Sequence, residues 1–310
     1  MEANLHFCFC SNSKNKMRKM RKFENMPINN FRPFLSSVPE SIPPYDHQEA
    51  RLFIEFGQKH FACFVVQNIT NTIIEYEVYQ LDVPFSEPEL LDFFKNHQFD
   101  KNDFSAVVII HNTKEFVLIP SELHKIHLEK TTIETIHGDL TELELLNDNL
   151  SKWEMTNVFG VHKSQFQLIN ELFPSASHLH INSIYLKAIF KQLMEMQEEW
   201  VKLYFYPSYF NVVVIKDTQV QIMQSFYYET PEDVIYFLLS LTEQFNLDVT
   251  TLVMQISGLI EKDSITYKEL TKYFLNIELE SDDTTRFLIN DEDPTPSHYF
   301  TPLFLSAQCV

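Results

Sequence analysis

One pattern of apolar and polar residues occurs twice in this chain, about 149 residues apart, in the stretches that begin at Arg51 and Trp200. Each copy predicts three strands, a helix and a fourth strand, in that order. The copies share this pattern but few identical residues, so the repeat indicates an architecture rather than an activity. A chain of 310 residues with 45% apolar content is long enough to bury a core in each copy.

Local signals place the elements of each copy. Short links between the first three strands favour antiparallel hairpins, and the fourth strand is a continuous apolar run, typical of a strand covered on both faces. Each helix begins with a hydroxyl, an early proline and acidic residues, which are capping signals. The first copy comprises strands Leu52–Phe56, His60–Gln67 and Ile73–Leu81, helix Glu87–Phe94 and strand Ser105–His111. The second comprises strands Val201–Tyr206, Tyr209–Lys216 and Val220–Tyr228, helix Thr230–Phe245 and strand Leu252–Gly258.

The remaining segments give a less regular pattern. The apolar run Glu115–Ile119 is followed by an irregular stretch in which Thr141–Leu146 is predicted to be helical. Residues 281–296 are predicted to form an acidic loop. The other predicted elements are strand Met155–Val161, helix Lys163–Phe173, strand His178–Asn182, helix Ser183–Gln197, helix Ser264–Phe274, strand Asn276–Glu280 and a short helix Tyr299–Leu305.

Three antiparallel strands, a helix and a strand added in parallel form the ribonuclease H-like topology. Two such units in tandem form the actin-like ATPase architecture, an α/β fold with mixed sheets. The sequence therefore predicts a flexible N-terminal arm over 1–46 and a first ribonuclease H-like lobe over 47–198, with an insertion around 121–152. A second lobe with a C-terminal helix is predicted over 199–310.

Several stretches resemble a bacterial domain-of-unknown-function family, numbered 3822, over roughly residues 48–309. They are Phe116–Leu123, Asn157–Phe159, Leu172–Pro174, His178–Asn182 and Thr230–Leu239. The resemblance implies an actin-like fold and brings no established activity. Members of this family resemble pilus and secretion scaffold proteins that have lost the ATPase signature, which makes this chain a candidate pseudo-ATPase.

The residues themselves argue against nucleotide chemistry in a cleft between the lobes. Active members of the fold surround phosphate and Mg²⁺ with two glycine-containing hairpins and paired aspartates. The first hairpin keeps Glu55 and Gly57 but lacks a second glycine, and the second hairpin, Tyr206–Tyr209, has neither an acid nor a glycine. We expect no productive ATP hydrolysis and no cofactor. The candidate ligand residues of the cleft are Glu55, Gly57, Ser257 and Gly258. The alternative is that the two glycines are present only because of the geometry of their turns.

Other groups of reactive side chains are weak candidates. His178 and His180 alternate on a predicted strand and could share a metal with His111 or Glu171, although hydrogen-bonded histidines are the simpler interpretation. Cys63 lies in an apolar strand, where an inert buried thiol is expected. A second weak metal cluster comprises Glu122, His124, His127 and Glu129.

Charge and cysteine content limit the partners. The net charge is −19, although the first 25 residues carry +4. The acidic remainder repels phosphate backbones and anionic lipids, so we expect neither nucleic acid binding nor membrane insertion. The basic start admits three interpretations: a translation start assigned too far upstream, a docking tail or an inert tail. Four scattered cysteines without disulfide-like spacing and the lack of a signal-peptide pattern favour the cytoplasm.

Three classes of function fit these features. The first is a non-catalytic scaffold module that binds a protein partner, with a homo-oligomer also compatible. The second is a degenerate nucleotide or small-ligand sensor that uses the interlobe cleft. The third is an enzyme of unrecognised type, for which His178, His180 and Glu55 are the first residues to inspect. The candidate residues for contact with a partner are Tyr204, Tyr206, Tyr209, Tyr227 and Tyr228. The alternative is that these tyrosines pack in the core and on the sheets.

Overall fold

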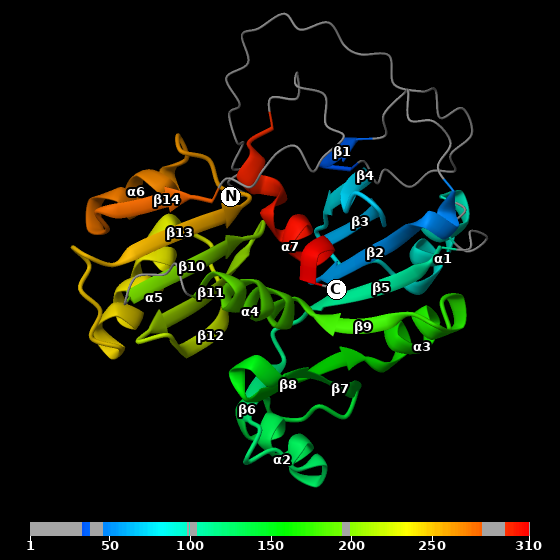
Figure 1. Ribbon diagram of the computed structural model, residues 1–310, viewed down its shortest axis with the longest axis horizontal. Coiled ribbons are helices and arrows are strands. Elements are labelled where there is room, and N and C mark those ends of the chain that lie inside the picture. The colour runs from blue at the N-terminus through cyan, green and yellow to red at the C-terminus, as the bar shows by residue number, and fades with distance from the viewer. Residues whose placement is uncertain are drawn as a thin grey trace, which may run out of the picture. The chain divides into compact units, whose positions relative to one another are not determined.

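The computed structural model of the 310-residue chain is shown in Figure 1. It describes residues 33–37, 46–97, 99, 104–193, 199–280 and 295–309. Most of the predicted flexible arm and the predicted acidic loop lie outside these described residues. All the elements below belong to one compact unit, 33–310.

The first sheet has six strands in the order β1-β4-β3-β2-β5-β9. Strands β2, β3 and β4 form the antiparallel meander that the short links predicted, and β5 and β9 are added in parallel. The bounds are β1 Leu35–Ser37, β2 Ala50–Gly57, β3 His60–Gln67, β4 Thr72–Gln80, β5 Ala106–Asn112 and β9 Ser177–His180.

The second sheet repeats this arrangement in the order β12-β11-β10-β13-β14. Even the irregularities correspond, because the register shifts between Val65 and Val66 in the first sheet and between Val214 and Ile215 in the second. These bulges are 149 positions apart, the spacing of the sequence repeat. The predicted pair of ribonuclease H-like units is therefore confirmed. The bounds are β10 Glu199–Phe205, β11 Tyr209–Lys216, β12 Gln219–Tyr227, β13 Val253–Gly258 and β14 Asn276–Leu279.

Helices α1 and α5 begin where their capping signals predict. In α1, Glu89 accepts hydrogen bonds from the backbone N–H and hydroxyl of Ser86, at 2.8 and 2.7 Å. In α5, Asp233 accepts the Thr230 N–H at 2.9 Å, while the Thr230 hydroxyl accepts the Asp233 N–H. The helices are α1 Glu87–Asn96, α2 Ile126–His137, α3 Lys163–Leu172, α4 Ile181–Gln192, α5 Pro231–Gln244, α6 Ile265–Tyr273 and α7 Thr301–Cys309.

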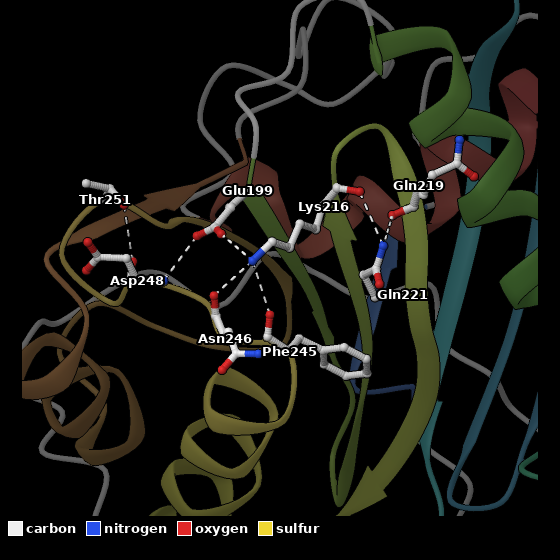
Figure 2. A network of polar contacts seen from close by, with 8 residues as sticks. All are labelled: Glu199, Lys216, Gln219, Gln221, Phe245, Asn246, Asp248 and Thr251. Atoms are coloured by element: carbon white, nitrogen blue, oxygen red, sulfur yellow. Dashed lines mark hydrogen bonds and ion pairs between the residues drawn. The ribbon is translucent and has the colours of Figure 1, made fainter.

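A lysine fixes the end of α5 to the second sheet. Figure 2 shows Lys216 Nζ, at the end of β11, donating to the carbonyl oxygens of Asn246 and Phe245 at 2.9 and 3.2 Å. The same Nζ lies 2.9 Å from a carboxylate oxygen of Glu199, whose other oxygen accepts the Asp248 N–H at 3.1 Å. A cation at this place satisfies carbonyls that the helix leaves unpaired and counters the negative end of its dipole.

The segment after β5 forms a third, antiparallel sheet in the order β6-β8-β7, where β6 is Phe116–Pro120, β7 Leu143–Leu150 and β8 Met155–His162. The helix predicted over Thr141–Leu146 is wrong. Leu143–Leu150 pairs with β8 along its whole length, and this pairing outweighs the helical propensity of the Glu and Leu residues. Helix α2 was not predicted, because its N-cap is Lys125, which makes no side-chain capping hydrogen bond.

Three smaller differences concern element ends. Leu35–Ser37, within the segment predicted as a flexible arm, forms β1 and pairs with Tyr76–Val78 of β4. Strand β9 ends at His180 rather than Asn182, because the His180 ring accepts the Asn182 N–H and caps α4. The C-terminal helix is longer than predicted: Ser297–Phe300 forms a 3₁₀ turn, and α7 follows it to Cys309. Two further short 3₁₀ turns are His47–Glu49 and Ser151–Trp153.

The core has separate layers on the two faces of each large sheet. One layer packs α1 and α3 against the first sheet, and another packs α5 and α6 against the second. A third layer contains residues from the opposite faces of both sheets together with α4 and α7, including Phe53, Tyr185, Tyr204, Val213 and Phe304. Residues at the ends of the sheet strands that face this shared layer therefore meet across it.

Candidate functional site

Glu55, near the end of β2, is fully buried at the junction of the two large sheets. Its Oε1 accepts a hydrogen bond from Asn112 Nδ2 on β5 at 2.8 Å and another from the hydroxyl of Tyr206, which follows β10, at 3.1 Å. His60 Nε2 on β3 lies 3.7 Å from the same oxygen. The carboxylate thus receives donors from the first sheet and from the start of the second hairpin.

Tyrosine rings fill the space on the second-sheet side of Glu55. The hydroxyls of Tyr185, on α4, and Tyr206 are 2.6 Å apart, and Tyr185 stacks on Tyr204 with ring centroids 3.6 Å apart. Tyr206 stacks on Tyr209 at 4.7 Å. All four rings are buried. These residues therefore pack within the core and do not form a surface that a partner could contact. Tyr227 is 38% exposed, and Tyr228 donates to the Tyr206 carbonyl at 3.2 Å.

The electrostatics of this cluster favour a charged Glu55 carboxylate. Burial alone would raise the pKa of Glu55, but the charge of the nearby His60 and hydrogen bonds from Asn112 and Tyr206 hold it below its ordinary value. Burial, followed by the charge of Glu55, raises the pKa of Tyr206 and Tyr209 well above the ordinary tyrosine value. Both phenols therefore remain protonated at neutral pH, and the Tyr206 hydroxyl donates to Glu55.

The cavity beside Glu55 is small. Its volume is about 20 Å³, and apart from Glu55 and His60 it is lined mainly by apolar and aromatic residues from β1, β4, the Phe205–Tyr206 turn, the segment after β13 and the C-terminal helical segment. Such a volume holds a single water molecule. Pockets for drug-sized ligands have volumes of roughly 300–1,000 Å³. This cavity therefore has no room for a nucleotide.

The two predicted ligand glycines lie where an added side chain would be crowded. A Cβ on Gly57 would lie 3.0 Å from the Tyr209 hydroxyl, so the first hairpin packs directly on a tyrosine of the second sheet. Gly258 has φ +83°, and a Cβ there would lie 2.2 Å from the Phe205 carbonyl oxygen, which accepts the Leu259 N–H at 2.9 Å. Ser257 is buried on β13, paired with Tyr204. Packing and turn geometry are sufficient reasons for both glycines.

The structure brings some of the predicted histidines together. His111 Nε2 and His178 Nδ1 are 2.9 Å apart, whereas both ring nitrogens of His180 are occupied, one by the Asn182 N–H and the other by the Thr113 carbonyl at 3.0 Å. Within the described ranges, no group of three or more His, Cys, Asp or Glu side chains is arranged to hold a metal. Hydrogen bonding accounts for His180. Glu171 lies on α3, the helix directly before β9, and belongs to no such group among the described residues.

The remaining candidates have ordinary surroundings. His124 Nε2 pairs with Glu129 at 2.6 Å, and Asn147 also donates to Glu129 at 3.3 Å. Glu122 is exposed, and the side chain of His127 lies outside the described part of the structure. Burial raises the pKa of the Cys63 thiol well above its ordinary value, which fits the expected inert state.

Sequence reasoning missed Asn112 and Tyr185, which complete the cluster around Glu55. Asn112 ends β5 and is separated from Glu55 by 57 positions, and Tyr185 lies on α4, 21 positions before Tyr206. The only sequence signal is the position of Asn112 directly after an apolar strand that runs parallel to β2, where polar residues at strand ends gather. No local pattern identifies Tyr185.

The comparisons with known proteins agree with this architecture. The model of the family described as "Protein of unknown function (DUF3822)" matches residues 41–277. The chain belongs to this family. A comparison with curated protein sequences gives no match. None of the helices in the described ranges is long and apolar enough to span a membrane.

Two solved structures establish the fold. The first is a Bacteroides thetaiotaomicron VPI-5482 protein of actin-like ATPase fold and unknown function. It is 18% identical, with a TM-score of 0.71 over 85% of this chain and 97% of that one. The second is the PilM–PilN type IV pilus biogenesis complex, 11% identical, with a TM-score of 0.50 over 83% of this chain and 97% of that one. At these identities the likeness shows that this DUF3822 member has the actin-like ATPase fold.

Proposed function

We propose that this DUF3822 member is a non-catalytic interaction or scaffold module built on the actin-like fold. The observation that carries the proposal is the filled junction between the two sheets. Where an active relative would need an open cleft, Glu55 is buried under Tyr206 and beside His60, and the remaining cavity measures about 20 Å³. A protein that keeps this two-sheet core without room for a nucleotide is suited to presenting surfaces.

The hydrogen bonding of Glu55 supports the same conclusion. A carboxylate that holds Mg²⁺ through water or directly must offer free oxygens to an open site. Here Oε1 is occupied by Asn112 and Tyr206. Oε2 is buried and has no hydrogen-bond partner in the described structure. The carboxylate is thus positioned to join two sheets rather than to receive a solvated cation.

One similar protein provides a precedent for the function class. PilM is solved in a complex with PilN for type IV pilus biogenesis, so a protein of similar fold works by binding a protein partner. We extend to this chain only the function class, a protein that binds another protein.

A degenerate nucleotide or small-ligand sensor is the second candidate, because polar atoms without partners surround the junction. Glu55 Oε2, Tyr209 Oη and Ser257 Oγ are buried without a hydrogen-bond partner among the described residues. Polar groups left in this way carry a desolvation cost that a bound ligand could offset. A sensor would require the tyrosine cluster to separate before a ligand could enter.

Thermal unfolding of the full chain with and without millimolar ATP or ADP and Mg²⁺ distinguishes the two candidates. A ligand present at 100 times its dissociation constant stabilises a protein by about 2.7 kcal/mol, which is a shift of a few degrees for a chain of this size. The scaffold proposal predicts no shift. A shift specific to nucleotide and diminished in Ser257→Ala would overturn it and support the sensor, while Ser240→Ala, on the exposed face of α5, serves as the matched control.

A further inference from the structure

Strand β1 is an addition to the first repeat. It pairs antiparallel with the outer edge of β4, with Leu35 opposite Val78 and Ser37 opposite Tyr76. In the second repeat, β12 occupies the position of β4, and no strand in the described part of the chain pairs with its outer edge. The family model also begins at residue 41, after β1. The second repeat thus forms its sheet without a counterpart of β1, and β1 is an accessory strand.

The contact that holds β1 in place is small. The strand is three residues long, whereas β4 is nine residues long. Within β1, Leu35 is the one apolar residue, and its side chain is only partly buried against the core layer that the two sheets share. The preceding Phe34 is 49% exposed. A strand held by so few pairs and by one apolar side chain opens at a low free-energy cost.

Leu35 also leaves space beside it. The cavity of about 20 Å³ next to Glu55 is lined by Leu35 and Val78, the pair that joins β1 to β4. Phe300 and Leu303 of the C-terminal helical segment line it as well. Side chains around unfilled space lose packing contacts. A strand with a larger apolar side chain opposite Val78 would fill this space and pack better than β1 does.

The charges on β4 favour a basic strand at this edge. Its charged residues are Glu75 and Glu77. Both lie near Cys63 of the adjacent β3, because burial and then the charges of Glu77 and Glu75 raise the pKa of that thiol. His97 lies 2.9 Å from Glu77, and when protonated it balances only one of the two carboxylates. Ser36 pairs opposite Glu77, so a Lys or Arg in its position would meet net negative charge.

We propose that the outer edge of β4 at Tyr76–Val78 binds an extended segment of a partner protein, which displaces β1 and adds as an antiparallel strand. The segment carries a bulky apolar residue opposite Val78 and a basic residue opposite Glu77. Backbone hydrogen bonds provide affinity, and these two side chains provide specificity. Strand β1 is then an internal competitor that lowers the apparent affinity. This inference rests on the proposed function, because it specifies the binding surface and the kind of partner of the scaffold.

The test is the binding of labelled peptides to the full chain, measured by fluorescence anisotropy at about 0.15 M salt. Three peptides of about eight residues alternate Phe with Lys, Phe with Glu, or Ala with Lys. The proposal predicts that the Phe–Lys peptide binds. The other two lack either the basic or the bulky apolar side chains, and we expect their dissociation constants to be higher by about tenfold or more. Equal binding of the Phe–Lys peptide and either of the others would overturn the stated chemistry.

A pair of variants identifies the site. Leu35→Gly weakens the internal competitor, so the dissociation constant of the Phe–Lys peptide should fall about tenfold. Leu275→Gly is the matched control, because this leucine is 69% exposed and lies in the second repeat, and it should leave the dissociation constant unchanged. Peptide binding that Leu35→Gly does not strengthen would overturn the proposal. A Leu35→Gly chain that doubles its mass of 36.7 kDa would overturn it as well, since a second copy would then occupy the edge.

Hydrogen–deuterium exchange provides a measurement without a variant. The Phe34 N–H donates to the Val78 carbonyl at 2.7 Å. Adding the Phe–Lys peptide should speed the exchange of this amide, because β1 is displaced, while the amides of β4 stay protected. Bound peptide with Phe34 still protected would overturn the proposal. Such a failure leaves the scaffold proposal standing, since that proposal is overturned by a nucleotide-specific shift in thermal unfolding.

Discussion

The Tyr206 hydroxyl donates to the Glu55 carboxylate at 3.1 Å, although the two residues are 151 positions apart in the chain. Each belongs to the first hairpin region of its own repeat, so the contact joins corresponding parts of the two sheets. In this protein that junction is occupied by side chains from within the chain. The actin-like ATPase fold is retained, and side chains of the chain itself pack together at this junction.

The buried histidines predict a loss of stability in acid. Burial lowers the pKa of His180 from 6.5 to about 4 and lowers that of His111 as well. A base whose pKa is lowered by folding contributes stability that is complete above pH 6.5 and is lost as the pH falls toward 4, because the unfolded chain binds the proton first. For His180 the loss is roughly 3 kcal/mol. Urea unfolding between pH 7 and 4.5 measures it, and His180→Asn should flatten this dependence.

His97 provides the comparison, because folding raises its pKa, whereas folding lowers the pKa of His180. Burial lowers its pKa, but the hydrogen bond and charge of Glu77, 2.9 Å away, outweigh burial and raise the pKa above 6.5. Its contribution is complete below pH 6.5 and is lost as the pH rises through the raised value. His97→Gln should therefore remove the decline in stability above pH 6.5. It should leave unchanged the loss of stability that the buried histidines cause below pH 6.5. Equal effects of both variants in one pH range would contradict these assignments.

The two junction glycines should respond differently to alanine. Gly258→Ala requires a positive φ and places Cβ 2.2 Å from a backbone oxygen, so we expect a loss of roughly 2–4 kcal/mol in unfolding free energy. For Gly57→Ala the nearest atom is the Tyr209 hydroxyl at 3.0 Å, and a small displacement of that ring limits the loss to about 1 kcal/mol. Chemical denaturation compares the variants. The reverse order would show that the Phe205 turn is not packed on Gly258 as described.

Much of the fold follows from local sequence signals. Alternating residues predicted the hairpins of both repeats, and Ser86 and Thr230 marked the starts of α1 and α5. The strand Leu143–Leu150 was missed because its Glu and Leu residues favour a helix locally, and only pairing with β8 decides otherwise. Propensity therefore failed where a contact distant in sequence determined the structure.

The candidate site was predictable only in part. Glu55, Gly57 and Gly258 were selected from turn patterns, and they do lie at the junction of the sheets. What fills the junction depends on Asn112 and Tyr185, whose contacts join elements that no local pattern relates. Tyr206 was predicted as either a partner contact or a packing residue, and its burial decides for packing.

The cation at the end of α5 gives a stability prediction. Lys216→Ala removes the donor to the Phe245 and Asn246 carbonyls and the ion pair with Glu199 (Figure 2). We expect a loss of about 1–2 kcal/mol that shrinks at high salt, since part of it is electrostatic. Lys130→Ala, whose side chain is exposed in an i,i+4 pair with Glu134, should change stability by only a few tenths of a kcal/mol. Similar losses for both lysines would contradict the capping role.

A double-mutant cycle on Glu55 and Tyr206 tests the central claim most directly. Each residue is removed alone, in Glu55→Leu and Tyr206→Phe, and then both together, with unfolding free energies measured in urea. Either single change leaves a buried polar group with a missing partner, whereas the double change removes both groups. The account predicts that the two losses are not additive, with a coupling energy of about 1–3 kcal/mol. Additive losses would show that the sheets are not joined through this pair and that the junction is open in solution.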